Sequence, residues 1–130
     1  MDINDFLAQD RFATASGIEL TEAGEGYARA QMRITPRHLN GAGVCQGGAL
    51  FTLADVTFAA ACNSHGNLTV TIQSNINIFR GEKEGILYAE GREVFDRRRL
   101  SNCDVRITNE AGDLVATFTG MGYRKEARIK

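Results

Sequence analysis

The sequence predicts an α+β domain in which one long, buried helix is wrapped by a curved antiparallel sheet of about five to six strands. Residues 49–63 are rich in Ala and Leu and are apolar on almost every side, as expected of a helix surrounded by other elements. Several later segments alternate apolar and polar residues, which is typical of half-buried strands. Their short connections favour antiparallel pairing in a meander.

The size and composition of the chain fit one domain over residues 1–130. It has 130 residues, 43% of them hydrophobic, and a net charge of -1, which argues against a nucleic-acid-binding protein. The three cysteines form no C-x-x-C pair, and the N-terminus is acidic where a signal peptide would be basic. No apolar run reaches the roughly 18 to 20 residues of a membrane helix. We therefore expect a cytoplasmic protein with no membrane segment.

Three features precede the long helix. The spacing of Ile3, Phe6 and Leu7 predicts a short amphipathic helix over residues 2–13, capped by Asp2. Alternation over residues 28–34 predicts a half-buried strand. A glycine-rich loop, residues 38–48, then leads into the helix.

Four more strands are expected after the long helix. Their predicted ranges are residues 68–78, 86–95, 103–108 and 114–123, with a turn at 109–113 before the last. A sheet this long on so short a chain leaves an edge or a face uncovered. We therefore expect a homo-oligomer.

Asp55 is the first candidate for chemistry. It lies inside the apolar helix, between Ala54 and Val56, too far from the start of the helix to be its cap. An ionised carboxylate there is costly unless it is paired, hydrogen-bonded or facing a cavity. Asp55 is therefore either a satisfied structural residue or part of a functional site.

Gly47 and Gly48 form the second candidate. Glycines at the start of a helix let a ligand approach backbone N–H groups that have no partner within the helix, and the helix dipole favours negative charge there. Such N–H groups could hold the oxyanion formed when a thioester is attacked. The alternative is a tight turn. Oxyanion donors and a carboxylate two turns apart on one helix would suit acyl transfer.

Other candidates are weaker. Cys45 could pair with His38 or His65 as a nucleophile and its base, but a small loop residue is the simpler interpretation. The cysteines and histidines lack zinc-ligand spacing, so no metal is expected. Arg97, Arg98 and Arg99 indicate either a phosphate-binding site or a solvated hairpin end.

The segment Asn40-Gly41-Ala42-Gly43-Val44-Cys45-Gln46-Gly47-Gly48, followed by Leu53-Ala54-Asp55, resembles the N-G-x-G-x-x-H-G-G…L-A-D pattern of PaaI-type hotdog-fold acyl-CoA thioesterases. The similarity continues through residues 58–66 and, in element order, over residues 12–124. The resemblance implies a hotdog fold, hydrolysis of an acyl- or aryl-CoA thioester, no cofactor, and assembly as a dimer of dimers.

The resemblance also implies roles for particular residues. Asp55 matches the carboxylate that acts as nucleophile or general base, and Gly47 matches the glycine whose N–H polarises the thioester carbonyl. Asn40 matches a loop residue that holds the carbonyl or the attacking water, and Thr71 matches a Ser or Thr contributed across the dimer interface. The acyl pocket would be lined by Gly48, Phe51, Phe58 and Phe79, and the nucleotide of coenzyme A would meet Arg97, Arg98 and Arg99.

Gln46 departs from the pattern, because the family has His at this position. Glutamine can donate and accept hydrogen bonds but cannot titrate as a general acid or base. Two alternatives therefore stay open. One is a hotdog module that binds acyl-CoA without cleaving it, and the other is a hotdog hydratase or dehydratase, although the motif lacks the His that such an enzyme requires.

Overall fold

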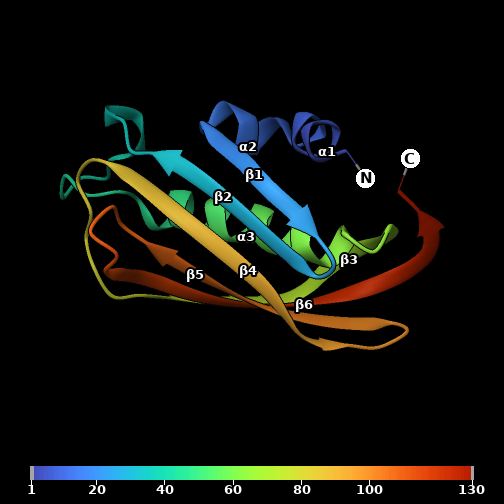
Figure 1. The fold of residues 1–130 in the computed structure, drawn as a ribbon. Helices are drawn as coiled ribbons and strands as arrows, with labels where there is room; N and C mark the ends of the chain where they lie inside the picture. The colour runs from blue at the N-terminus through green and yellow to red at the C-terminus, as the bar shows by residue number, and fades with distance from the viewer. Residues whose placement is uncertain (1, 130) are drawn as a thin grey trace.

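In a computed structural model, which describes residues 2–129, a six-stranded antiparallel sheet curls around one long helix (Figure 1). The α+β architecture predicted from the sequence is confirmed. No helix in the described part of the chain is long and apolar enough to cross a membrane. The elements in chain order are α1 Ile3–Gln9, α2 Arg11–Ala15, β1 Ile18–Gly24, β2 Tyr27–Arg33, the 3-10 helix η1 Pro36–His38, α3 Gly47–Asn63, β3 Asn67–Ile78, β4 Ile86–Asp96, β5 Leu100–Thr108 and β6 Leu114–Arg128.

Helix α3 forms the centre of the core, as its all-round apolar sequence predicts. Its 17 residues span about 25 Å at the usual helical rise. Leu53 and Phe58 are almost completely buried, and Phe58 packs on Phe118 of β6. Thr57 is also fully buried, and its hydroxyl donates to the Leu53 carbonyl oxygen at 2.7 Å. That bond removes most of the cost of burying a polar group.

The order of strands in the sheet is β1-β2-β4-β5-β6-β3. Strands β4, β5 and β6 form the predicted meander, but β3 does not precede them in it. Instead β3 pairs with β6 at the far edge, in register from Asn67 opposite Arg128 to Ile78 opposite Ala116. The connection to β4 therefore crosses one end of the sheet, where Cys45 N–H donates to the Glu82 carbonyl oxygen at 2.7 Å.

The N-terminal region differs from the single helix that the apolar spacing predicts. The chain forms two short helices, because Asp10 ends the first and caps the second by accepting a hydrogen bond from Ala13 N–H at 3.0 Å. The expected cap is present, since Asp2 accepts a hydrogen bond from Asp5 N–H at 3.4 Å.

Strand β1 was not predicted. Its apolar alternation stops after Leu20, where the pairing with β2 shifts register between Leu20 and Glu22. Such an irregularity breaks the period-two pattern on which strand prediction depends.

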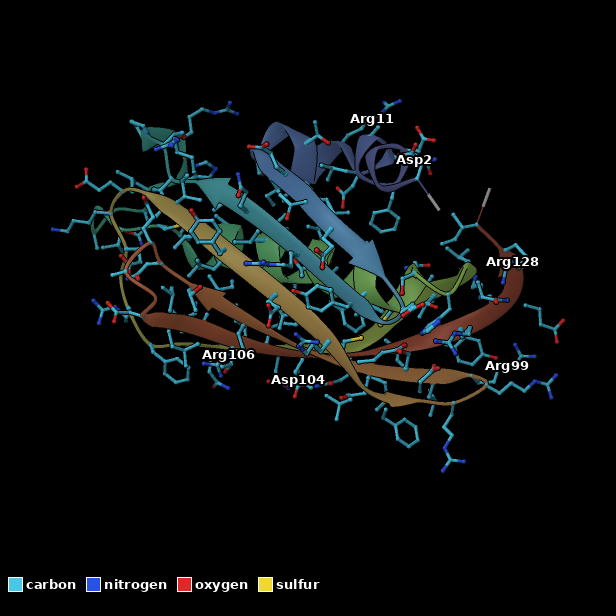
Figure 2. The ribbon with its side chains drawn as sticks, in the orientation of Figure 1. Asp2, Arg11, Arg99, Asp104, Arg106 and Arg128 are labelled. Atoms are coloured by element: carbon cyan, nitrogen blue, oxygen red, sulfur yellow. The ribbon has the colours of Figure 1, made fainter. Side chains whose placement is uncertain are left out.

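The two edges of the sheet differ in whether other elements cover them. Helices α1 and α2 pack against β1. Strand β3 has a free edge, and along it Leu68, Val70, Ile72 and Ile78 are large apolar side chains that remain exposed. On the outer face of the sheet, Asp104 and Arg106 of β5 point away from α3 (Figure 2).

Candidate active site

The glycine-rich loop before α3 is held in one shape by its own polar groups. The Asn40 side-chain oxygen accepts hydrogen bonds from the N–H groups of Ala42, at 2.9 Å, and Val44, at 3.2 Å. Gly43 adopts φ 78°, a left-handed conformation that suits glycine. The predicted role of Asn40 in holding a carbonyl or a water is therefore accompanied by a role in shaping the loop.

The N-terminus of α3 presents two free backbone donors. Neither Gly47 N–H nor Gly48 N–H donates a hydrogen bond to any group within residues 2–129. Gln46 occupies the cap position with extended backbone, but its side chain does not cap the helix. The positive end of the helix dipole is thus open to an anion or to a developing oxyanion.

Two cavities flank this helix end. One, of about 280 Å³, brings Asn40 and Gly47 together with Ile78, Phe79 and Arg80 of the crossing connection. The other, of about 270 Å³, lies on the side of Gln46 and is also lined by Gly48, Thr52, Phe12 and His38. The structure therefore groups Asn40 with Gly47, and Gln46 with Gly48. Phe12 and Ile78 were not predicted as site residues, because only the fold brings them there.

Asp55 is half-buried between the buried residues Ala54 and Val56. Its carboxylate makes no hydrogen bond or ion pair with any of residues 2–129. Burial raises the pKa of Asp55 above the ordinary aspartate value, and the charge of Asp10 raises it further. Asp55 is therefore not the satisfied structural residue considered above.

Gly47 and Asp55 do not meet within one chain. They are eight positions apart on the helix, which is about 12 Å along its axis. A thioester carbonyl bound at the Gly47 N–H is consequently out of reach of the Asp55 carboxylate on the same helix. The prediction that Gly47 and Asp55 act in one acyl-transfer site stays a prediction, and it requires more than the two groups of one helix.

The predicted pocket phenylalanines differ in their surroundings. Phe51 is half-buried and meets Phe118 edge to face at 5.4 Å. Phe58 is a core residue with 1% of its surface exposed, so it does not line a pocket in this chain. Phe79 is 59% exposed beside the Gly47 cavity. Thr71 is exposed on the free-edge strand β3.

Arg97, Arg98 and Arg99 form the turn between β4 and β5, at the opposite end of α3 from Gly47 (Figures 1 and 2). Arg99 pairs with Glu126 at 2.6 Å, while Arg98 remains largely exposed. A shallow cavity of about 400 Å³ is lined by Asn67, Arg98, Arg99, Arg124, Lys125 and Glu126. This end of the molecule is basic, but within one chain it is far from the free N–H groups.

Cys45 has no histidine partner among the described residues. Burial raises the pKa of its thiol to about 11. The His38 ring instead contacts the Thr35 N–H and the Ser16 carbonyl, and His65 contacts Glu93. A Cys–His nucleophile is therefore absent from residues 2–129, and the two ring nitrogens of His38, beside the Gln46 cavity, are engaged by Thr35 and Ser16.

Known proteins with similar sequences and structures include thioesterases. Acyl-coenzyme A thioesterase PaaI of Escherichia coli is 36% identical over 116 residues, which cover 88% of this chain and 83% of that protein. The structure of E. coli PaaI superposes with a TM-score of 0.93 at 33% identity, covering 98% of this chain and 93% of that one. A hypothetical thioesterase of Streptococcus pneumoniae, solved with coenzyme A, superposes with a TM-score of 0.89 at 29% identity, covering 98% and 100%.

A third structural neighbour, from Streptococcus mutans, was solved bound to acetyl-CoA. It superposes with a TM-score of 0.82 at 29% identity, covering 86% of this chain and 91% of that one. The family model of the thioesterase superfamily matches residues 42–116, which include the free helix end and Asp55. The chain therefore belongs to the thioesterase superfamily, as a thioester hydrolase with the hotdog fold of PaaI.

Proposed function

We propose that the protein hydrolyses acyl- or aryl-CoA thioesters to the free acid and CoA. The observation that carries the proposal is the free Gly47 N–H at the open N-terminus of α3. Hydrogen-bond donors placed before the reaction are effective where an oxyanion develops. The PaaI relative is named for this activity, and two structural neighbours hold coenzyme A or acetyl-CoA. These relatives support CoA as the thiol half of the substrate.

Each group then has a role in the reaction. The carbonyl oxygen accepts a hydrogen bond from Gly47 N–H, and the loop held by Asn40 keeps that donor in place. Asp55 either attacks the carbonyl carbon, giving an anhydride that water cleaves, or removes a proton from an attacking water. In both routes the C–S bond breaks and CoA leaves as its thiolate. A carboxylate with a raised pKa and no hydrogen-bond partner within residues 2–129 suits either role.

We propose that the active site is shared between two copies of the chain. The separation of about 12 Å along α3 prevents one chain from supplying both Gly47 and Asp55. Two β3 edges that pair antiparallel would run the two α3 helices in opposite directions and cover the exposed apolar side chains. Asp55 and Thr71 would then approach Gly47 of the other copy. Residues 97–99 of the first copy would likewise approach the substrate bound at Gly47 of the other copy. Two such dimers would form the expected tetramer.

Gln46 stays important because its side chain makes no hydrogen bond with residues 2–129 and is free to contact a substrate. Since glutamine does not titrate, proton transfer falls to Asp55 alone.

We also propose a cytoplasmic location, because the three cysteines are all free.

The test is thiol release from a panel of aryl, short, medium and long acyl-CoAs, with Asp55→Ala as the matched variant. We expect turnover by the wild type and a loss of about 10²–10⁴ in rate in the variant. Sedimentation of both proteins should show the same oligomer. Near-wild-type turnover by Asp55→Ala would refute its role. Binding without release from any substrate by the wild type would indicate a non-catalytic acyl-CoA-binding module.

A further inference from the structure

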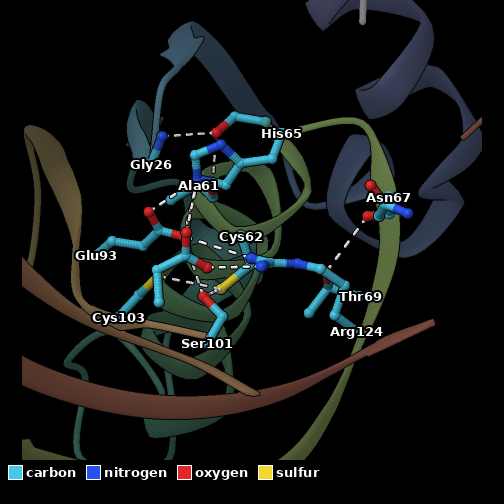
Figure 3. Close-up of polar contacts among 12 residues, drawn as sticks. Gly26, Ala61, Cys62, His65, Asn67, Thr69, Glu93, Ser101, Cys103 and Arg124 are labelled. Atoms are coloured by element: carbon cyan, nitrogen blue, oxygen red, sulfur yellow. Dashed lines mark hydrogen bonds and ion pairs between the residues drawn. The ribbon is translucent and has the colours of Figure 1, made fainter. Parts of the chain in front are cut away.

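A second polar cluster lies at the C-terminal end of α3, away from the proposed site (Figure 3). At its centre are the thiols of Cys62, on α3, and Cys103, on β5. Their sulfur atoms are 3.0 Å apart, and both side chains are completely buried. That separation is about 1 Å longer than a disulfide bond. Both cysteines are free.

A chain of polar contacts connects these thiols to the surface. The Cys62 sulfur lies 3.4 Å from the Ser101 hydroxyl, and Ser101 donates to a Glu93 carboxylate oxygen at 3.1 Å. The other Glu93 oxygen lies 2.8 Å from His65 Nε2. The side-chain exposure rises from 14% at Glu93 to 35% at His65. A proton leaving Cys62 thus has a continuous route to solvent.

Arg124 supplies positive charge to the same cluster. One of its terminal nitrogens lies 2.6 Å from an Asp96 oxygen and another 3.7 Å from Glu93. Its buried Nε and Nη2 atoms have no hydrogen-bond partner. Because the guanidinium already balances both carboxylates, it opposes a metal cation among His65, Glu93 and Asp96. Its charge also lowers the pKa of Cys62, which partly offsets the opposite and larger effect of the Glu93 carboxylate.

The two sulfurs differ in how readily they ionise. The hydrogen bond with Cys103 lowers the pKa of Cys62, against the opposing effect of burial, and the Ser101 hydroxyl lowers it further. The same bond and burial raise the pKa of Cys103. Cys62 also has the Ser101 hydroxyl 3.4 Å from its sulfur as a route for its proton, so we assign Cys62 as the attacking sulfur and Cys103 as the resolving one.

We propose that Cys62 and Cys103 are a redox-active dithiol, which hydrogen peroxide converts to an intrachain disulfide. The Cys62 thiolate attacks one peroxide oxygen, so an S–O bond forms, the O–O bond breaks and one water leaves. The Cys103 sulfur then attacks the Cys62 sulfur, so the S–S bond forms, the S–O bond breaks and a second water leaves. Two thiols are oxidised, one peroxide is reduced, and the two thiol hydrogens end in the two waters.

The disulfide would tie the last turn of α3 to β5 across 41 positions of the chain. Closing a loop of this length restricts the unfolded chain, and we expect the melting temperature to rise by about 10 °C. Asp55 lies two turns away on the same helix and is not consumed. The reaction is therefore independent of thioester hydrolysis, and its test does not depend on that activity.

The experiment uses Cys45→Ala as the background, because it leaves only the two paired thiols. The protein is treated with hydrogen peroxide and quenched; one portion is denatured for intact mass and thiol count, and the other stays folded for the melting temperature. We expect the loss of two hydrogen atoms and of both thiols, the rise in melting temperature, and reversal of all three by dithiothreitol. The matched variants are Cys62→Ser and Cys103→Ser in the same background, and neither should gain stability on oxidation.

Peptide mapping of oxidised wild-type protein provides a check that requires no variant. A peptide that joins Cys62 to Cys103 supports the proposal. Two unreacted thiols, addition of oxygen atoms to either cysteine without a bond between them, or a disulfide between two chains would each overturn it.

Discussion

The two ends of helix α3 are built in opposite ways. At the N-terminal end the amides of Gly47 and Gly48 have no partner within residues 2–129, and two cavities lie beside them. At the C-terminal end, polar groups are linked in a network. Asn63 alone donates to the carbonyl oxygens of Ala59 and Thr69 and accepts from Thr69 N–H, at 2.8, 3.2 and 2.8 Å.

Along α3, the groups proposed for thioester hydrolysis are therefore separate from the polar contacts that stabilise the fold. Backbone donors left unpaired at an open helix end cost little, because water can reach them, and they stay available for a substrate. Most polar groups buried at the other end are hydrogen-bonded, apart from Nε and Nη2 of Arg124, and each such group left unpaired costs about 1–3 kcal/mol. Substitutions at the first end should therefore change activity, and substitutions at the second should change stability.

A large loss of turnover is expected from Gly47→Pro, compared with Gly47→Ala. Gly47 is the first residue of α3, where proline removes the N–H without breaking a helical hydrogen bond and where the fixed φ of proline is compatible with the helix. The extended backbone of Gln46 is the conformation that a residue before proline prefers. We expect kcat of the proline variant to fall about 10²–10³-fold below that of the alanine variant. Steady-state thiol release measures this. Equal rates in the two variants, both folded, would remove the oxyanion role of Gly47.

Asn63→Ala should destabilise the protein by about 2 kcal/mol, because it leaves the buried backbone groups of Thr69 without their side-chain partner. Urea unfolding at one fixed protein concentration measures the change. Gln46→Ala is the control at the open end, and its free energy of unfolding should stay within about 0.5 kcal/mol of wild type. A larger loss for the control than for Asn63→Ala would contradict the comparison.

Asp55→Asn should abolish turnover but raise stability at neutral pH. An acid whose pKa is raised by folding contributes stability below its unfolded pKa, and that contribution is lost as the pH rises through its folded pKa. Asparagine carries no charge, so the variant does not lose this stability as the pH rises. We expect a higher melting temperature than wild type at pH 7, and no difference below about pH 4. A lower melting temperature at pH 7 would show that the Asp55 carboxylate is stabilised by folding.

The smallest effect is expected from Asp10→Asn. Asparagine still caps α2, but the negative charge that raises the pKa of Asp55 is gone. The acid limb of the pH–rate profile should therefore move to lower pH, with kcat at its plateau unchanged. An unmoved limb would mean that Asp10 does not influence Asp55 in the assembled enzyme.

The sequence alone determined the elements with a regular local pattern. The all-round apolar helix, the alternating strands and the glycine loop could be predicted, because periodicity and turn chemistry are properties of neighbouring residues. Asp55 and Gly47 could be singled out for the same reason. One is a charge inside an apolar stretch, and the other is a glycine at the start of a helix.

Tertiary structure decided what depends on distant parts of the chain. It placed β3 beside β6 and paired β1 with β2 despite a register shift that interrupts the apolar alternation of β1. It also buried Phe58 in the core and brought the Cys62 and Cys103 sulfurs into contact. It also showed that Gly47 and Asp55, close in sequence, lie about 12 Å apart along their helix. Local periodicity carries no information on which strands pair or which side chains meet. Those contacts follow from packing the whole chain around α3.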